Sequence, residues 1–243
     1  MRTFIFLLSI APLCAQFELR SPAFGCHAGA NGQLRLFQGV RASLVALPLL
    51  AEGARAGLCN SQFVLYQSEG EVVLSAGGIT YAMSLAESAQ LALGEGVAVV
   101  ISPANGEIRY WQDGSWRLSP ALIDGSVSAV RVVGGKATIL SAERVITIGL
   151  VSGAIEHNSP APRHGPVVSL LGDGSILTIV DERWIHCVGS ECSDVGRAPG
   201  GVVSLTPLNE EWLAASTESG TVLAVRVKQR QVESFFLPGS AQE

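Results

Sequence analysis

Residues 97–120 read VAVVIS-PANGE-IRYW-QDGS-WRLSP, and this stretch decides the fold. Three segments that contain apolar and aromatic residues are separated by two short polar turns. Asn105-Gly106 and Asp113-Gly114 are strong signals for two-residue hairpin turns, because those turns need positive φ angles that Asn, Asp and Gly tolerate. The stretch therefore predicts three antiparallel strands connected as a meander.

The same pattern recurs along the rest of the chain. Further copies start at Phe24, Phe63, Ala137, Ile176 and Trp212. Successive starts are 34 to 40 residues apart. A short strand precedes the later copies, and two of these strands share the letters Val-Ser-Leu, at residues 168–170 and 203–205. A unit of about 40 residues with four short strands is typical of propeller blades, which cannot bury their faces alone and must stack.

The sequence therefore predicts an all-β fold, a six-bladed β-propeller of four-stranded antiparallel meander blades. A five-bladed ring and a β-sandwich are the alternatives, since both also have short strands at regular spacing. The expected blades cover residues 16–50, 51–87, 88–123, 124–163, 164–198 and 199–240 in one domain. Phe17–Arg20 is expected to be the inner strand of the first blade, with Phe24 opening its second strand. Tyr81–Leu93 is expected to form strand, loop and strand rather than a helix.

The N-terminal residues 1–15 (MRTFIFLLSIAPLCA) are interpreted as a secretory signal peptide, with Arg2 before an apolar segment and Ala15 at the cleavage site. Cys14 suggests a lipid anchor, but bulky Leu13 stands before it where a small residue is required. No later segment has about 18 uninterrupted apolar residues, so no membrane span is expected in the mature chain. The expected location is secreted or periplasmic.

Composition and motifs narrow the classes of function. The net charge is −5 and the basic residues are scattered singly, which disfavours nucleic acid and anionic membranes as partners. The chain has no nucleophile motif of the G-x-S-x-G type and no glycine-rich phosphate loop. Strand alternation places His186 and Cys187 on opposite faces, so these residues do not form a metal site with Cys192. The sequence predicts no cofactor and no metal.

Four cysteines remain after the signal peptide. Cys187 and Cys192 flank a predicted turn between two strands, where cross-strand residues meet disulfide geometry. Cys26 and Cys59 form a second candidate pair, in the first blade's second strand and the second blade's inner strand. Disulfides persist in the oxidising compartments that exported proteins reach.

The segments that connect one blade to the next carry the candidate binding residues. The most polar is 157–164 (HNSPAPRH), and the set consists of His157, Arg163, His164, Asp124 and Arg197. Loops on a rigid scaffold are where binding residues usually lie, although a solvated crossover would have the same composition. We expect a monomer that recognises a protein or a small polar ligand at the mouth of the central channel.

This repeat resembles exported bacterial β-propeller proteins of the WD-repeat, YVTN and NHL-like group. The resemblance covers the whole mature chain and rests on repeat length and turn placement. Trp111, Trp184 and Trp212 are not followed by the Asp of WD repeats. The resemblance therefore implies an architecture and no activity. The function expected is non-catalytic binding or scaffolding; the alternative is a propeller-type hydrolase or lyase acting on a sugar or lactone, which would require a convergent cluster of acids or histidines.

Overall fold

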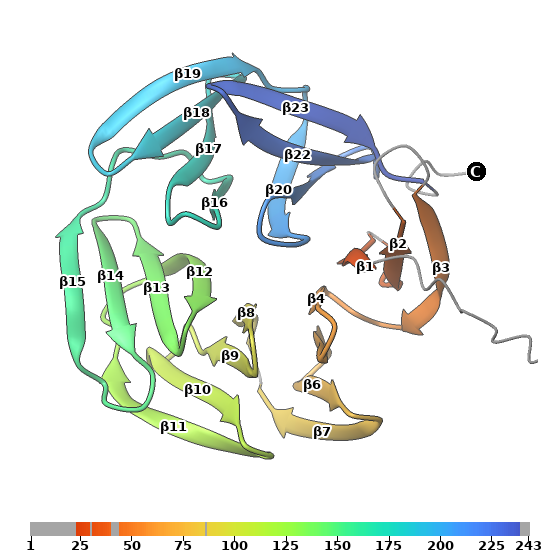
Figure 1. Cartoon of the computed structure of the whole chain (residues 1–243), viewed down its shortest axis with the longest axis vertical. Coiled ribbons are helices and arrows are strands. Elements are labelled where there is room, and N and C mark those ends of the chain that lie inside the picture. The colour runs from red at the N-terminus through yellow and green to blue at the C-terminus, as the bar shows by residue number, and fades with distance from the viewer. Residues whose placement is uncertain (1–22, 30, 40–43, 86, 239–243) are drawn as a thin grey trace, which may run out of the picture.

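Six antiparallel sheets surround a common axis in the computed structural model, which forms a six-bladed β-propeller (Figure 1). The structure describes residues 23–29, 31–39, 44–85 and 87–238. Within these residues it contains strands and turns and no helix. No helix that could cross a membrane is present in the described part of the chain. The predicted signal peptide, Cys14 and Phe17–Arg20 lie outside the described residues.

Each blade is built from consecutive strands. Blades 1 to 3 contain β1 (Ala23–Ala28), β2 (Leu34–Gln38), β3 (Val45–Ala51); β4 (Ala56–Cys59), β5 (Phe63–Ser68), β6 (Glu71–Ala76), β7 (Ile79–Ser84); and β8 (Gln90–Gly94), β9 (Val97–Ile101), β10 (Glu107–Gln112), β11 (Ser115–Leu122). Blades 4 to 6 contain β12 (Val127–Val133), β13 (Lys136–Ser141), β14 (Arg144–Gly149), β15 (Ile155–Pro160); β16 (Val168–Leu170), β17 (Ile176–Val180), β18 (Arg183–Val188), β19 (Glu191–Arg197); and β20 (Val202–Pro207), β21 (Leu213–Thr217), β22 (Val222–Lys228), β23 (Gln231–Phe236).

Two local expectations are resolved by these bounds. Tyr81–Leu93 contains the end of β7 and most of β8 and no helix, as the repeat predicts. The strand that contains Phe24 was expected to be the second of its blade, and this is wrong. It is β1, which contacts β4, the inner strand of blade 2. Figure 1 places β1 on the inner side of its sheet.

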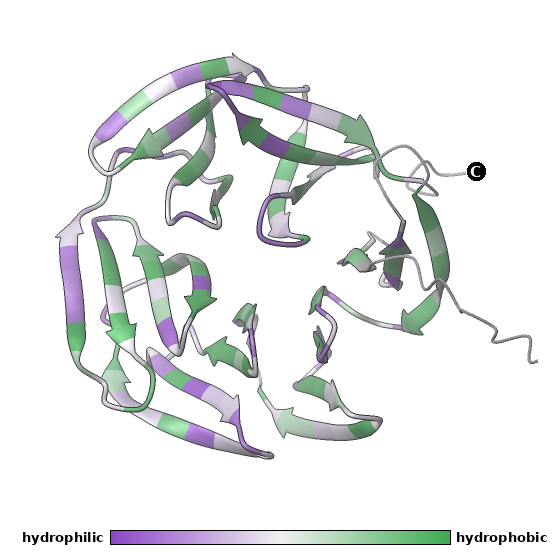
Figure 2. Ribbon diagram, viewed as in Figure 1, coloured by the Kyte–Doolittle hydropathy of each residue, from purple (hydrophilic) through white to green (hydrophobic). Residues whose placement is uncertain are grey.

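The core lies between the blades. Six clusters of buried apolar side chains each join two neighbouring sheets, as in the cluster that joins Val99 and Ile101 of blade 3 to Ile139 and Ile148 of blade 4. Every residue of β9 is buried, whereas β15 at the outer edge is almost wholly exposed. Figure 2 shows the same contrast, with hydrophobic colour on β9 and hydrophilic colour along most of β15. Burial on both faces explains the unbroken apolar run of β9, the second strand of its blade.

Among the described residues, blade 6 closes the ring against blade 1 without exchanging a strand with it. Asn209 Nδ2 donates to the carbonyl oxygen of Phe24 (2.8 Å), and the Phe24 and Trp212 rings lie 5.9 Å apart. His27 Nε2 and Ser216 Oγ are 3.0 Å apart. The four described strands of blade 6 are consecutive in sequence, and side-chain contacts join this blade to the described part of blade 1.

The cysteines divide into a bonded pair and a free pair. Cys187 and Cys192 are directly opposite on β18 and β19 and form a disulfide, which confirms that prediction. Cys26 and Cys59 are buried free thiols, so the second predicted bridge is absent from the structure. They lie on neighbouring inner strands and belong to one buried cluster. Cys26 was expected on the second strand of blade 1, and it lies on the inner strand β1, next to Cys59 on β4.

Candidate functional site

The predicted binding residues lie mainly on one face of the ring, where the outer strand of each blade leads to the inner strand of the next. Asp124 lies in the connection from β11 to β12, Arg163 and His164 in the connection from β15 to β16. Arg197 ends β19 on the same face. His157 differs, because residues 155–160 form strand β15 rather than a loop. Its Nε2 lies 3.0 Å from Ser159 Oγ on the outer edge of blade 4.

Two of these residues already have partners within the chain. His164 Nδ1 lies 2.9 Å from the carbonyl oxygen of Gly165, and its Nε2 lies 3.3 Å from the carbonyl oxygen of Ser141. Arg197 pairs with Glu182 at 3.2 Å on an exposed surface. An exposed ion pair of this kind contributes little to stability. Arg163 is exposed to solvent. These residues are thus spread over the face rather than gathered around one point.

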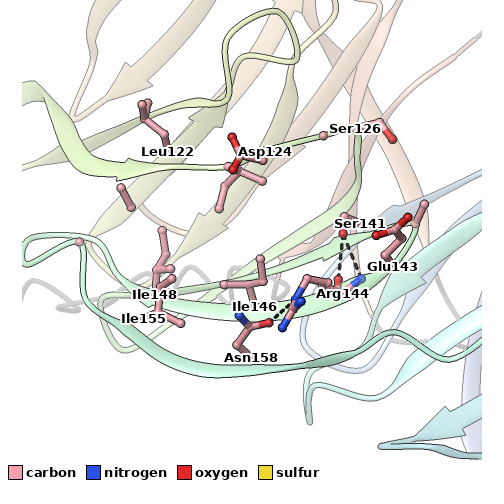
Figure 3. Close-up of a pocket in the computed structure, with 15 residues that line it drawn as sticks. Leu122, Asp124, Ser126, Ser141, Glu143, Arg144, Ile146, Ile148, Ile155 and Asn158 are labelled. Atoms are coloured by element: carbon pink, nitrogen blue, oxygen red, sulfur yellow. Dashed lines mark hydrogen bonds between the residues drawn. The ribbon is translucent and has the colours of Figure 1, made fainter.

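Asp124 lines a cavity of about 700 Å³ between blades 3 and 4. One wall is the end of β11 with the following connection, and the opposite wall is formed by β14 and β15. Figure 3 shows Leu122 and Asp124 on one side of the space and Ile146, Ile148 and Ile155 across from them. The cavity therefore lies in the groove between two blades, at the periphery of the ring.

Exposed apolar side chains stand on both walls of this cavity. Leu122 is 65% exposed and Ile155 is 61% exposed. Behind them Ile148 is fully buried in the cluster that joins the two blades. The apolar surface therefore continues from the core to the solvent. Apolar surface left open on facing walls is a feature of interaction sites rather than of ordinary protein surface.

The rim of the cavity is polar and carries more acidic than basic groups. Asp124 and Glu143 are exposed carboxylates on opposite sides of the opening, and Arg144 is the only cation among the lining residues. Arg144 Nε donates to Asn158 Oδ1 at 2.6 Å, as Figure 3 shows. The Ser141 hydroxyl accepts from the amide of Arg144 (3.1 Å) and so fixes the turn before β14. The rim therefore favours a cationic group on a bound partner.

Two glycines shape the walls of the cavity, one within blade 3 and one between blades 3 and 4. A Cβ on Gly106 (φ +67°) would lie 2.0 Å from the carbonyl oxygen of Ile123, directly before Asp124. A Cβ on Gly153 (φ +67°) would lie 2.6 Å from Pro120 Cγ, at the end of the cavity near the β14–β15 turn. Both positions require a residue without a side chain, because φ is positive and a Cβ would clash: at Gly106 with the connection after β11 of the same blade, and at Gly153 with the neighbouring blade 3. Gly153 therefore allows the close approach of the two blades, and Gly106 allows the connection that carries Asp124 to lie against the β9–β10 turn.

The sequence pointed to Asp124 and missed the other groups of the rim and walls. Glu143 and Arg144 lie at a short charged turn, and such a turn in a sequence indicates an exposed hairpin and no binding site. Leu122 and Ile155 lie on outer strands, where an apolar residue is common in any sheet. The sequence does contain apolar residues on two consecutive outer strands, Leu122 and Ile155. Their significance can be recognised only once the structure shows that both side chains border the same cavity.

A second group of side chains has the composition of a catalytic site. His186 Nε2 lies 2.8 Å from Ser175 Oγ, and that hydroxyl donates to Asp173 Oδ1 at 2.5 Å. In a hydrolytic triad the carboxylate orients the histidine, whereas here it accepts from the serine. Ser175 is also buried, at 4% exposure, and its amide donates to the same carboxylate oxygen at 2.9 Å. These contacts cap a turn and do not activate a nucleophile. No group of three or more potential metal ligands is present among the described residues.

Of the comparisons with known proteins, the one with solved structures supports the fold. No protein-family description matches the chain, and no curated protein matches it. Among solved structures, Kluyveromyces lactis Hsv2 is similar with a TM-score of 0.50 and 10% identity, over 85% of this chain and 79% of that one. A KlHsv2 variant with loop 6CD replaced by a Gly-Ser linker is similar with a TM-score of 0.51 and 11% identity, over 85% and 77%. YCF48 from Cyanidioschyzon merolae has a TM-score of 0.47 and 9% identity, over 74% and 67%. At such identities the similarity to the Hsv2 structures shows that this chain has a β-propeller fold, and the function has to be argued from its own surface.

Proposed function

We propose that the protein is an exported, non-catalytic binding or scaffolding β-propeller that captures a segment of a partner protein in the cavity between blades 3 and 4. The observation that carries the proposal is the exposure of Leu122 and Ile155 on facing walls of one cavity. Leaving two large apolar side chains in water is unfavourable, and a partner's apolar side chain placed between them would bury both.

The chemistry of the cavity defines the segment that would fit. The apolar walls accommodate an aliphatic or aromatic side chain. Asp124 and Glu143 at the rim attract a neighbouring Lys or Arg of the same segment. The chain's net charge of −5 favours approach of a basic partner as well. We therefore expect the recognised segment to carry an apolar side chain beside a basic one.

The cavity has a suitable size and support for this role. Its volume of about 700 Å³ lies within the range of roughly 300 to 1,000 Å³ typical of binding pockets. Its floor includes Ile123 and Ile148, which belong to the buried cluster of blades 3 and 4. Because the walls are parts of strands anchored in that cluster, binding would order few additional groups, and less free energy would be lost on association.

The other predicted binding residues extend this surface. Arg163 and Arg197 lie on the same face as Asp124, at later blade connections, and would contact a partner that covers more of the ring. His164 would act by holding the turn at Ser141, which its imidazole contacts. His157 would contact a partner only along the outer edge of blade 4, on strand β15.

Export is part of the proposal and rests on the predicted signal peptide at residues 1–15. The Cys187–Cys192 disulfide supports it, because such bonds persist in oxidising compartments. Fractionation of the producing cells tests it directly. We expect the mature chain, beginning after residue 15, outside the cytoplasm; a full-length chain that remains in the cytoplasm would contradict export.

The binding proposal is tested by selecting displayed random peptides on the purified protein. We expect enrichment of sequences with an aliphatic or aromatic residue beside Lys or Arg. The variant Leu122→Glu places a charge on the exposed wall and should weaken binding of the selected peptides about tenfold or more. Leu118→Glu is the matched control, since Leu118 is 58% exposed on the same strand and does not line the cavity.

The two variants separate loss of binding from loss of folding. Both should melt within a few degrees of the parent protein, because both replaced side chains are mostly in water. Absence of enriched peptides of this type would overturn the proposal. Equal binding of a selected peptide to Leu122→Glu, Leu118→Glu and the parent would overturn it too.

A further inference from the structure

A second cavity, of about 630 Å³, lies on the opposite face of the ring, where inner strands turn back into their sheets. It is lined by β12 of blade 4, by the turn at residues 171–173 in blade 5 and by residues 210–211 in blade 6. His186, Arg226 and Lys228 complete its charged lining. Side chains of three consecutive blades therefore meet in it, and they are charged where those of the first cavity are apolar.

Arg131 is the unusual residue of this cavity. Its Nε is buried and has no hydrogen-bond partner. Its guanidinium makes no ion pair with any described residue, although nearby carboxylates act on it through space. Burial lowers the pKa of Arg131, and Glu210 and Asp173 oppose that change. A partly buried guanidinium that pairs with no described residue has lost part of its hydration without gaining a partner, and its N–H donors can still bind a carboxylate.

Two carboxylates stand near this guanidinium without contacting it. Asp173 Oδ1 accepts from the amide and hydroxyl of Ser175, at 2.9 and 2.5 Å. Burial raises the pKa of Asp173, but these hydrogen bonds and His186 outweigh it and leave the pKa below its usual value. Asp173 is therefore ionised at neutral pH. Glu210 is exposed and pairs with no cation among the described residues.

In the same cavity, the neighbouring Arg226 is an arginine whose guanidinium is paired with carboxylates. Its guanidinium contacts Glu211 at 2.9 Å and Glu233 at 2.8 Å, and it lies 4.6 Å from the centre of the Trp212 ring. Arg131 has no such set of partners. The fold can thus pair an arginine fully at this place, and it leaves Arg131 and the two carboxylates apart.

Gly172 brings these groups together. A Cβ at this position would lie 2.4 Å from the carbonyl oxygen of Glu210 and 3.2 Å from an Nη of Arg131. Any side chain there would displace the backbone of blade 6 and press on the guanidinium. The absence of a side chain therefore allows the turns of blades 5 and 6 to approach Arg131 on both sides.

We propose that this cavity binds a small zwitterion of the amino-acid type, with its carboxylate on the Arg131 guanidinium and its ammonium between Asp173 and Glu210. Both halves of such a ligand are required. An anion alone would meet Arg131 but be repelled by the two carboxylates, and a cation alone would leave Arg131 without a partner. The volume exceeds that of a free amino acid, so there is room for a side chain as well. The site lies on the face opposite the blade 3–4 cavity and is independent of it.

The test measures the shift in melting temperature with each common L-amino acid at millimolar concentration, followed by calorimetric titration of the strongest. We expect at least one amino acid to raise the melting temperature. Acetate and methylammonium, which reproduce the two halves of the ligand separately, should raise it much less. An absence of any shift and of any binding heat across the set would overturn the proposal.

Variants then test which residues bind the amino acid. Arg131→Lys keeps the charge and removes the fork of donors, and Glu210→Gln removes one carboxylate at an exposed position; each should weaken binding about tenfold. Glu218→Gln is the matched control, an exposed glutamate on the other face, and should bind as the parent does. Unchanged affinity in both Arg131→Lys and Glu210→Gln would overturn the assignment. The variant Leu122→Glu should bind the amino acid normally, so failure here and failure of the blade 3–4 proposal are distinguishable.

Discussion

The interface between blades 3 and 4 and the interface between blades 1 and 2 differ greatly in how they are packed. Among the described residues, thirteen buried apolar side chains join blades 3 and 4. Four join blades 1 and 2, and two of these are the free cysteines. One interface consists of interlocking valines and isoleucines, and the other of small side chains around Leu34 and a thiol pair.

This difference indicates where the ring is rigid and where it is weakly held. The proposed binding cavity stands on the large aliphatic interface, where the walls are fixed before a partner arrives. The N-terminal blade is attached to blade 2 through the small cluster around Cys59, whereas it packs against blade 6 through a larger cluster that includes Phe24 and Trp212. We expect the ring to open first between blades 1 and 2 and last between blades 3 and 4.

The largest expected effect comes from truncating a buried side chain in the aliphatic interface between blades 3 and 4. Ile139 is fully buried between blades 3 and 4, and Ile139→Ala should lower the free energy of unfolding by about 4 kcal/mol. Leu34→Ala, at an equally buried position in the small cluster, should cost about 2 to 3 kcal/mol because fewer buried neighbours lose contact. Urea denaturation of both variants measures the difference. A cost for Leu34→Ala equal to or above that of Ile139→Ala would contradict the comparison.

The next effect concerns His27, at the junction of blades 1 and 6. Burial lowers the pKa of His27 from 6.5 to about 4 in the folded protein. Between about pH 6.5 and pH 4, His27 is protonated in the unfolded chain but not in the folded protein. The free energy of unfolding should therefore fall as pH decreases through this window. The loss should be roughly 3 kcal/mol. The difference between the parent and His27→Gln, measured by urea denaturation across these pH values, isolates this contribution; parallel curves would contradict it.

A smaller effect is expected from the Cys187–Cys192 disulfide in blade 5. The bond closes a short hairpin, and its reduction should lower the free energy of unfolding by roughly 2 kcal/mol. Mass spectrometry of the unreduced protein shows whether the bond is present, and denaturation with and without reductant gives its contribution. Two free thiols at these positions in protein recovered without reductant would show that the disulfide is not formed.

The smallest effect on stability, but a direct probe of the blade 1–2 interface, is the reactivity of Cys26 and Cys59. Burial raises the pKa of the Cys26 thiol well above its usual value, and a hydrogen bond to Cys59 adds to this. The reactive thiolate is therefore scarce, and alkylation of the native protein at mildly alkaline pH should be slow and should become fast on unfolding. Fast alkylation of the native protein would contradict the buried environment. Failure to alkylate after unfolding without reductant would reveal a bridge.

The architecture was accessible from sequence because it depends on local signals. Hairpin turns such as Asp113-Gly114 and strands such as Val97–Ile101 repeat at a period that only stacking sheets explain, and Cys187 and Cys192 face each other across one hairpin. The expected two-residue turn at Asn105-Gly106 is wrong, because five residues, 102–106, connect β9 to β10 and only Gly106 of the pair has positive φ. The first blade was assigned one strand out of register because its own copy of the pattern is the weakest.

The candidate site was much less accessible because it depends on contacts between blades. Asp124 was selected for its place in a blade connection, but the opposite wall of the cavity comes from the next blade, 17 to 34 residues further along the chain. His164 was selected for the same reason, and its imidazole contacts the carbonyl oxygen of Ser141, a residue of the preceding blade 4 turn. Sequence periodicity specifies which strands pair within a sheet, whereas the facing of side chains across an interface follows from the packed structure.

The most direct test of the proposed binding role is a charge exchange at the rim of the blade 3–4 cavity. A selected peptide with a basic residue beside its apolar anchor is compared with its Lys→Glu counterpart, each titrated into the parent protein and into Glu143→Lys. We predict that the parent prefers the basic peptide, and that Glu143→Lys weakens the basic peptide about tenfold while strengthening the acidic one. Identical affinities of both peptides for both proteins would contradict binding at this cavity.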